Sequence, residues 1–89
     1  MGKAAIIQVY GRVQGVGFRF YTQKKARELA ITGYVRNRAD GSVYIEATGE
    51  AENMNLFIRW CEEGPTWAHV SKIEQQEIPV FKADDFRIK

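Results

Sequence analysis

The sequence is poor in residues that form covalent or metal-bound frameworks. Cys61 is the only cysteine and His69 the only histidine among 89 residues. A lone cysteine cannot form an internal disulfide, and His69 has no partner at metal-ligand spacing, so a disulfide scaffold and a zinc cluster are excluded. Cys61 lies on an apolar helical stripe, where we expect it to pack in the core rather than act as a nucleophile.

Long hydrophobic runs and strong net charge are also absent. The apolar run at residues 4–10 is far too short for a signal peptide or a membrane span. The 13 basic and 11 acidic side chains give a net charge of +2, which allows a small anionic ligand but lacks the basic stripe typical of nucleic-acid binding. No linker or repeat divides residues 1–89. We therefore expect one domain in a reducing, cytoplasmic setting.

Hydrophobic periodicity predicts the element order β-α-β-β-α-β. The expected strands are residues 4–10, 33–37, 42–48 and 68–78, and the expected helices run from Phe18 or Arg19 to Ala30 and over residues 50–63. Gly33 is expected to mark the end of the first helix, and Asp40-Gly41 to form a hairpin turn. Gly64-Pro65 should end the second helix, and residues 85–89 should form a short closing strand.

This order is that of the α+β ferredoxin-like sandwich, an antiparallel sheet with strand order 4-1-3-2 and both helices on one face. In that layout the first and second strands run in the same direction, with the third strand between them. Their ends therefore emerge at the same edge of the sheet. We expect the loop after the first strand, the start of the first helix and Asn37 to meet there.

The segment from Tyr10 to Phe20, YGRVQGVGFRF, combines backbone freedom with a fixed positive charge. A glycine-rich loop that leads into a helix N-terminus can bind an anion, because its N–H groups converge and the helix dipole favours negative charge. Arg19 adds a guanidinium fork that matches phosphate oxygens. The spacing is neither G-x-G-x-x-G nor a P-loop. Spacing alone therefore leaves an anion site and an ordinary tight turn both open.

Three longer motifs closely resemble those of acylphosphatases. GRVQGVGFRFYTQKKA at residues 11–26 is similar to the family's G-x-V-Q-G-V-x-F-R, and GYVRNRADGSVYIEATG at residues 33–49 is similar to its G-x-V-x-N-x-x-D/x-G-x-V. GPTWAHVSKIE at residues 64–74 also fits the family's spacing. The likeness covers essentially the whole chain.

The resemblance implies hydrolysis of a small-molecule acyl phosphate to a carboxylate and inorganic phosphate, without metal or cofactor. It implies that Arg19 binds the phosphoryl group and that Asn37 holds the attacking water through its side-chain amide. The backbone N–H groups that would share phosphoryl binding are those of Gln14, Gly15, Val16, Gly17 and Phe18. We expect a monomer that binds neither nucleic acid nor a membrane.

Two alternative functions remain open. Tyr10, Tyr34 and Tyr44 could share the open face of the sheet, and RNA-recognition domains of the same element order stack bases on such aromatics. Against this, DGSVYIEA lacks the RNA-binding signature, and Glu46 lies amid the tyrosines. The other alternative is a non-catalytic accessory module, since acylphosphatase-like domains also occur at the head of a large carbamoyl-transfer maturation factor. The absence of a linker or further domain before Lys89 leads us to expect a stand-alone enzyme.

Overall fold

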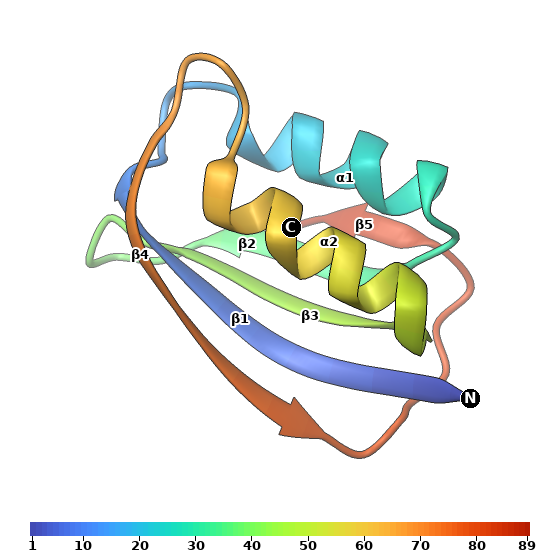
Figure 1. The fold of residues 1–89 in the computed structure, drawn as a ribbon. Helices are drawn as coiled ribbons and strands as arrows, with labels where there is room; N and C mark the ends of the chain where they lie inside the picture. Colours follow the sequence, from blue (N-terminus) through green and yellow to red (C-terminus); the bar gives the residue numbers. More distant parts are fainter.

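The computed structural model describes all 89 residues, which form two helices on one face of a five-stranded sheet (Figure 1). The elements are β1 (Gly2–Arg12), α1 (Phe18–Glu28), β2 (Thr32–Asn37), β3 (Val43–Glu50), α2 (Ala51–Glu63), β4 (His69–Ile78) and β5 (Phe86–Ile88). Their order confirms the predicted β-α-β-β-α-β pattern with the short closing strand. Neither helix has the length and hydrophobicity that crossing a lipid bilayer requires.

The sheet has the order β4-β1-β3-β2-β5. The predicted arrangement of the first four strands is therefore confirmed, and all pairings among them are antiparallel. The expectation of a purely antiparallel sheet is corrected by β5, which pairs in parallel with β2. After β4 the chain passes around one end of the sheet and returns along the free edge of β2 (Figure 1). The pairing covers part of an edge that would otherwise be exposed.

One hydrophobic core fills the space between the helices and the sheet. Alternate residues of the strands point inward, among them Ile7, Val35 and Ile45, and each is fully buried. The stripes predicted on the two helices face the same core, and Cys61 packs there as expected. Burial raises the pKa of the Cys61 thiol, because the thiolate would lose its hydration.

The end of α1 differs from the sequence expectation. Helical structure stops at Glu28, and Ala30 adopts the left-handed conformation with φ 55°. The N–H of Ile31 donates to the Ala26 carbonyl at 2.8 Å, which gives the hydrogen-bond pattern of a Schellman motif. The prediction that Gly33 ends the helix is wrong. Gly33 lies within β2 with φ 138°, where a Cβ atom would come within 1.9 Å of the Glu46 carbonyl oxygen.

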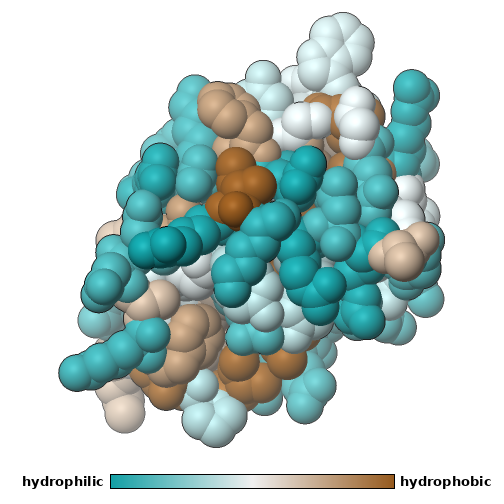
Figure 2. Space-filling model, turned by 180° about the vertical axis from the view of Figure 1, so that it is seen from behind, coloured by the Kyte–Doolittle hydropathy of each residue, from teal (hydrophilic) through white to brown (hydrophobic).

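The outer face of the sheet is largely hydrophilic (Figure 2). The hydroxyls of Tyr34 and Tyr44 both donate to Glu46 Oε2 at 2.8 Å, and the Tyr10 hydroxyl donates to Glu74 at 3.1 Å. Partial burial and the neighbouring Glu46 raise the pKa of Tyr44 to about 12.

Cations lie over these same rings. The guanidinium carbon of Arg36 is 4.8 Å from the centroid of Tyr44, and Lys89 Nζ is 4.0 Å from that of Tyr34. The faces of these tyrosine rings are therefore contacted by cationic side chains of the protein itself. An RNA-binding sheet instead leaves its aromatic faces open for bases to stack on.

Candidate functional site

The loop between β1 and α1 has alternating backbone handedness. Gly15 and Gly17 have φ values of 74° and 80°, whereas the only non-glycine residue with positive φ in the chain is Ala30. The signs of φ therefore alternate from Gln14 to Phe18. Such alternation turns successive N–H groups toward one side and forms an anion-binding concavity. Only glycine adopts the two left-handed positions at little cost.

The N–H groups of this loop are free of main-chain partners. None of the amides from Gln14 to Phe18 donates to a main-chain carbonyl, and Gly17 caps α1 without a side-chain hydrogen bond. Free donors at a helix N-terminus, combined with the helix dipole, favour a bound anion.

Arg19 and Asn37 face one hollow of about 210 Å³. Its lining residues are Val13, Gly15, Gly17, Phe18, Arg19, Phe20, Asn37 and Ile88. Arg19 is the only charged side chain among them, so the hollow presents positive charge. Arg19 Nη1 donates to the Lys89 carbonyl oxygen at 3.2 Å. The half-buried Asn37 amide has no hydrogen-bond partner within the protein.

The strand order explains why these residues meet. β1 and β2 both end at the edge of the sheet where the loop after β1 begins, and the loop between β2 and β3 lies at the same end (Figure 1). This is the juxtaposition expected from the sequence. Two of the predicted backbone donors, Gln14 and Val16, are not among the residues that line the hollow, and the Val16 side chain packs against the core.

Sequence reasoning missed the side chain of Gln14. Its Nε2 donates to the carbonyl oxygens of Arg38 at 2.7 Å and of Ser42 at 2.9 Å. These bonds tie the glycine loop to the turn that follows Asn37. No local pattern could have identified them, because the acceptors lie 24 and 28 positions away in the sequence.

The turn after Asn37 is itself well braced. Gly41 has φ 91°, as the Asp-Gly turn prediction requires, and its N–H donates to the Arg38 carbonyl at 3.1 Å. Asp40 Oδ1 accepts from the Ser42 hydroxyl at 2.6 Å and from its N–H at 2.9 Å. These bonds lower the pKa of Asp40, because they stabilise its carboxylate form.

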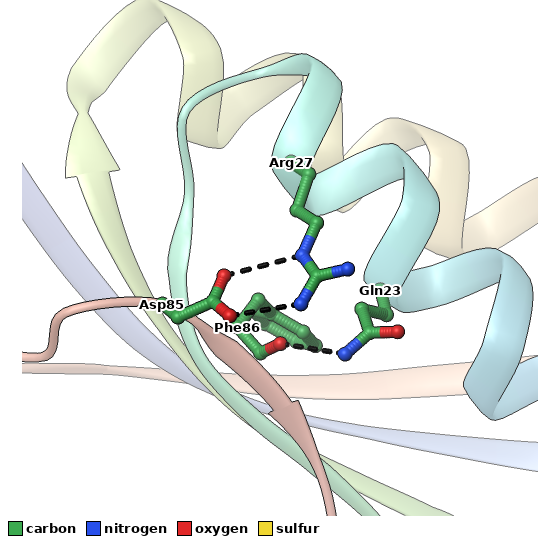
Figure 3. A network of polar contacts seen from close by, with 4 residues as sticks. All are labelled: Gln23, Arg27, Asp85 and Phe86. Atoms are coloured by element: carbon green, nitrogen blue, oxygen red, sulfur yellow. Dashed lines mark hydrogen bonds and ion pairs between the residues drawn. The ribbon is translucent and has the colours of Figure 1, made fainter.

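Two side chains of α1 hold β5 and the residue before it in place. Arg27 makes two hydrogen bonds to the Asp85 carboxylate at 3.2 and 2.8 Å, and Gln23 Nε2 donates to the Phe86 carbonyl at 2.8 Å (Figure 3). These contacts fix the strand whose last residues reach the hollow. Ile88 lines it, and Lys89 bonds Arg19.

The chain gathers no group of three or more His, Cys, Asp or Glu side chains able to hold a metal ion.

A family model described as Acylphosphatase matches residues 5–88. The chain belongs to the acylphosphatase family. The family's activity is hydrolysis of the carboxyl–phosphate bond of small-molecule acyl phosphates, and the chain carries that activity.

Curated relatives agree with this membership over nearly full length. An acylphosphatase of Aliivibrio fischeri is 41% identical over 86 residues, which are 97% of this chain and 96% of the relative. An acylphosphatase of Oceanobacillus iheyensis is 52% identical over 73 residues, 81% of this chain and 80% of the relative.

Solved structures give the same result. The structure of an acylphosphatase from Coxiella burnetii matches with a TM-score of 0.95 and 40% identity, over 99% of this chain and 93% of that one. Full-length HypF, in a phosphate- and nucleotide-bound form, matches with a TM-score of 0.88 and 32% identity, but this chain covers only 12% of it. The near-complete matches favour the hydrolase over the RNA-binding and accessory-module alternatives.

Proposed function

We propose that residues 1–89 act as one catalytic domain whose active site is the hollow between the glycine loop, Arg19 and Asn37. The observation that carries the proposal is the meeting of three features at one end of the fold. These are free amides from Gln14 to Phe18, a guanidinium, and a side-chain amide without a protein partner.

In this proposal, the loop amides and Arg19 bind the non-bridging oxygens of the phosphoryl group. The guanidinium offers five N–H donors, of which the bond to Lys89 uses one. Donors fixed before the substrate arrives stabilise the charge of the transition state without reorganisation. The N-terminus of α1 adds its dipole to the same anion.

Asn37 holds the attacking water in line with the phosphorus. The leaving group is a carboxylate whose conjugate acid has a pKa near that of glutamic acid, about 4.3, so it departs at neutral pH without a general acid. A phosphate oxygen of the substrate accepts the proton of the water. Positioning and charge stabilisation are then the main tasks of the protein, and a hollow lined by no Asp, Glu or His meets them.

The test is release of inorganic phosphate from benzoyl phosphate with EDTA present. Arg19→Ala should lower kcat/KM by about 10²–10³-fold, as loss of one fixed oxyanion donor does. Asn37→Ala should lower kcat more than it raises KM, because it removes positioning of the water and leaves phosphoryl binding intact. Arg59→Ala is the matched control, since Arg59 is an exposed arginine of α2 that does not line the hollow.

Two results would contradict the proposal. Turnover near the wild-type rate in either site variant would remove that residue from the mechanism. Loss of wild-type activity in EDTA would show that a metal is needed.

We also propose that the enzyme works as a monomer in a reducing, cytoplasmic setting, without a nucleic-acid partner. This is supported by the burial of its only thiol and by the tyrosines of the outer face, whose hydroxyls are bonded to Glu46 and Glu74.

A further inference from the structure

The proposed phosphoryl site has an apolar rim that phosphate binding does not explain. Four hydrophobic residues line the hollow, but Val13 and Phe18 are each only 1% exposed and offer it little surface. Phe20 and Ile88 are 57% and 40% exposed. The open apolar surface of the hollow therefore belongs to these two side chains.

Phe20 and Ile88 come from different parts of the fold. Phe20 lies in the first turn of α1, directly after Arg19, whereas Ile88 lies in β5 beside Val35 of β2. The Phe20 ring meets Tyr21 edge-on with centroids 5.2 Å apart, which restricts its orientation. Single exposed apolar residues are ordinary on protein surfaces. Two that border the same proposed anion site form an apolar surface that a ligand can contact.

We propose that Phe20, together with Ile88, binds the acyl group of the substrate and makes the enzyme prefer aromatic or bulky apolar acyl phosphates to small ones. This inference rests on the proposed function, because it places the phosphoryl group among the loop amides and Arg19. In-line attack requires the acyl oxygen to leave on the side of the phosphorus opposite the water. The acyl group then extends out of the hollow, whose exposed apolar side chains are those of Phe20 and Ile88.

The hollow itself offers an acyl group apolar contacts rather than a second cation. Arg19 is the only cation that lines the hollow, and it is already assigned to the phosphoryl group. Beyond Phe20 lies a separate hollow that contains Lys24, Arg27 and Glu28. There Arg27 is paired with Asp85 and Glu28 is paired with Lys25, so Lys24 is the one cation of this second hollow without an ion pair.

The test compares kcat/KM for benzoyl phosphate and acetyl phosphate in wild type, Phe20→Ala and Phe20→Tyr. We expect the benzoyl-to-acetyl ratio to fall by about tenfold in Phe20→Ala, the effect of losing one aromatic contact in a binding site. Phe20→Tyr should keep the wild-type ratio, because it retains the ring. Alanine is a better helix former than phenylalanine, so Phe20→Ala should fold.

Leu56→Ala is the control, because Leu56 is a large exposed apolar residue of a helix, 49% exposed, that lies outside the hollow. An unchanged benzoyl-to-acetyl ratio in Phe20→Ala, whether kcat/KM stays the same for both substrates or falls equally for both, would overturn the inference. The proposed function fails separately, through active Arg19→Ala or Asn37→Ala variants, so the two failures can be distinguished.

Discussion

Gln14 connects two segments of the proposed active site that are far apart in the sequence. Its side-chain amide donates to two carbonyl groups of the turn after Asn37, at 2.7 and 2.9 Å. The glycine loop carries the amides, and the turn follows the residue proposed to hold the water. We therefore infer that Gln14 is a positioning residue that sets the loop against Asn37.

Replacing Gln14 with alanine should lower both the stability of the fold and the turnover rate. Two part-buried hydrogen bonds are lost, each with a net contribution of about 0.5–1.5 kcal/mol, so the free energy of unfolding should fall by about 1–3 kcal/mol. Urea unfolding measures this change, and phosphate release from benzoyl phosphate should show kcat falling more than KM rises. Gln76→Ala, at an exposed glutamine of β4, is the control. Equal stability of the two variants would contradict the bracing role.

For single residues, the sequence predicts membership of the proposed site well, but it does not predict side-chain contacts between distant segments. The motif likeness pointed to Arg19 and Asn37, and both line the hollow. It could not indicate the contacts of Gln14 with Arg38 and Ser42, which exist only after the strands have paired. The hydrophobic pattern, for its part, assigned the end of α1 to Gly33, whereas Ala30 takes the left-handed position. Tertiary packing of Ile31 and Ala26 in the core outweighs the local preference for glycine there.

Among the elements, β5 is the shortest, and polar side chains of α1 hold it. It has only three residues, and its pairing with β2 is reinforced by Arg27 and Gln23 of α1 (Figure 3). The hydrogen bonds from Arg27, followed by one from the Phe86 N–H, lower the pKa of Asp85. A carboxyl with a lowered folded-state pKa stabilises the fold above its unfolded pKa, and this contribution disappears as pH falls through the folded-state value.

We expect the attachment of β5 to weaken in acid. Below the ordinary aspartate pKa of about 3.9, protonation of Asp85 removes the ion pair with Arg27. Asp85→Asn should be less stable than wild type at neutral pH, and the difference should shrink as pH falls below about 4. Urea midpoints measured across this range test the prediction. Asp84→Asn, which removes a neighbouring exposed carboxylate without an ion pair, is the control. A difference in urea midpoint between Asp85→Asn and wild type that stays the same at all pH values would contradict this prediction.

The element order was predictable because hydrophobic periodicity changes clearly between strands and helices. The parallel pairing of β5 was not predictable, because three residues carry no periodic signal and the partner strand lies more than 50 positions earlier. The position of Gly33 shows the same limit. Its requirement for glycine comes from the close approach of β3 at Glu46, a contact that no local pattern contains.

In the whole molecule, the candidate catalytic groups line one hollow, and the segments that carry them, the loop after β1, the start of α1 and the end of β2, meet at one end of the sheet (Figure 1). The opposite face of the sheet is covered by tyrosines bonded to acidic side chains and contacted by cations. The net charge of +2 is small, so anion binding has to come from local geometry rather than from a general basic field. We therefore expect a single small-anion site.

Titration of the ¹⁵N-labelled protein with inorganic phosphate, followed by amide chemical shifts, tests this claim most directly. We expect saturable shifts that are largest for the amides of residues 14–18, the Arg19 guanidinium and the Asn37 side chain. In Arg19→Ala the same amides should respond only at higher phosphate concentration, because a charge-assisted bond is lost. Saturable shifts confined to the tyrosine face, or no saturable response in the glycine loop, would contradict it.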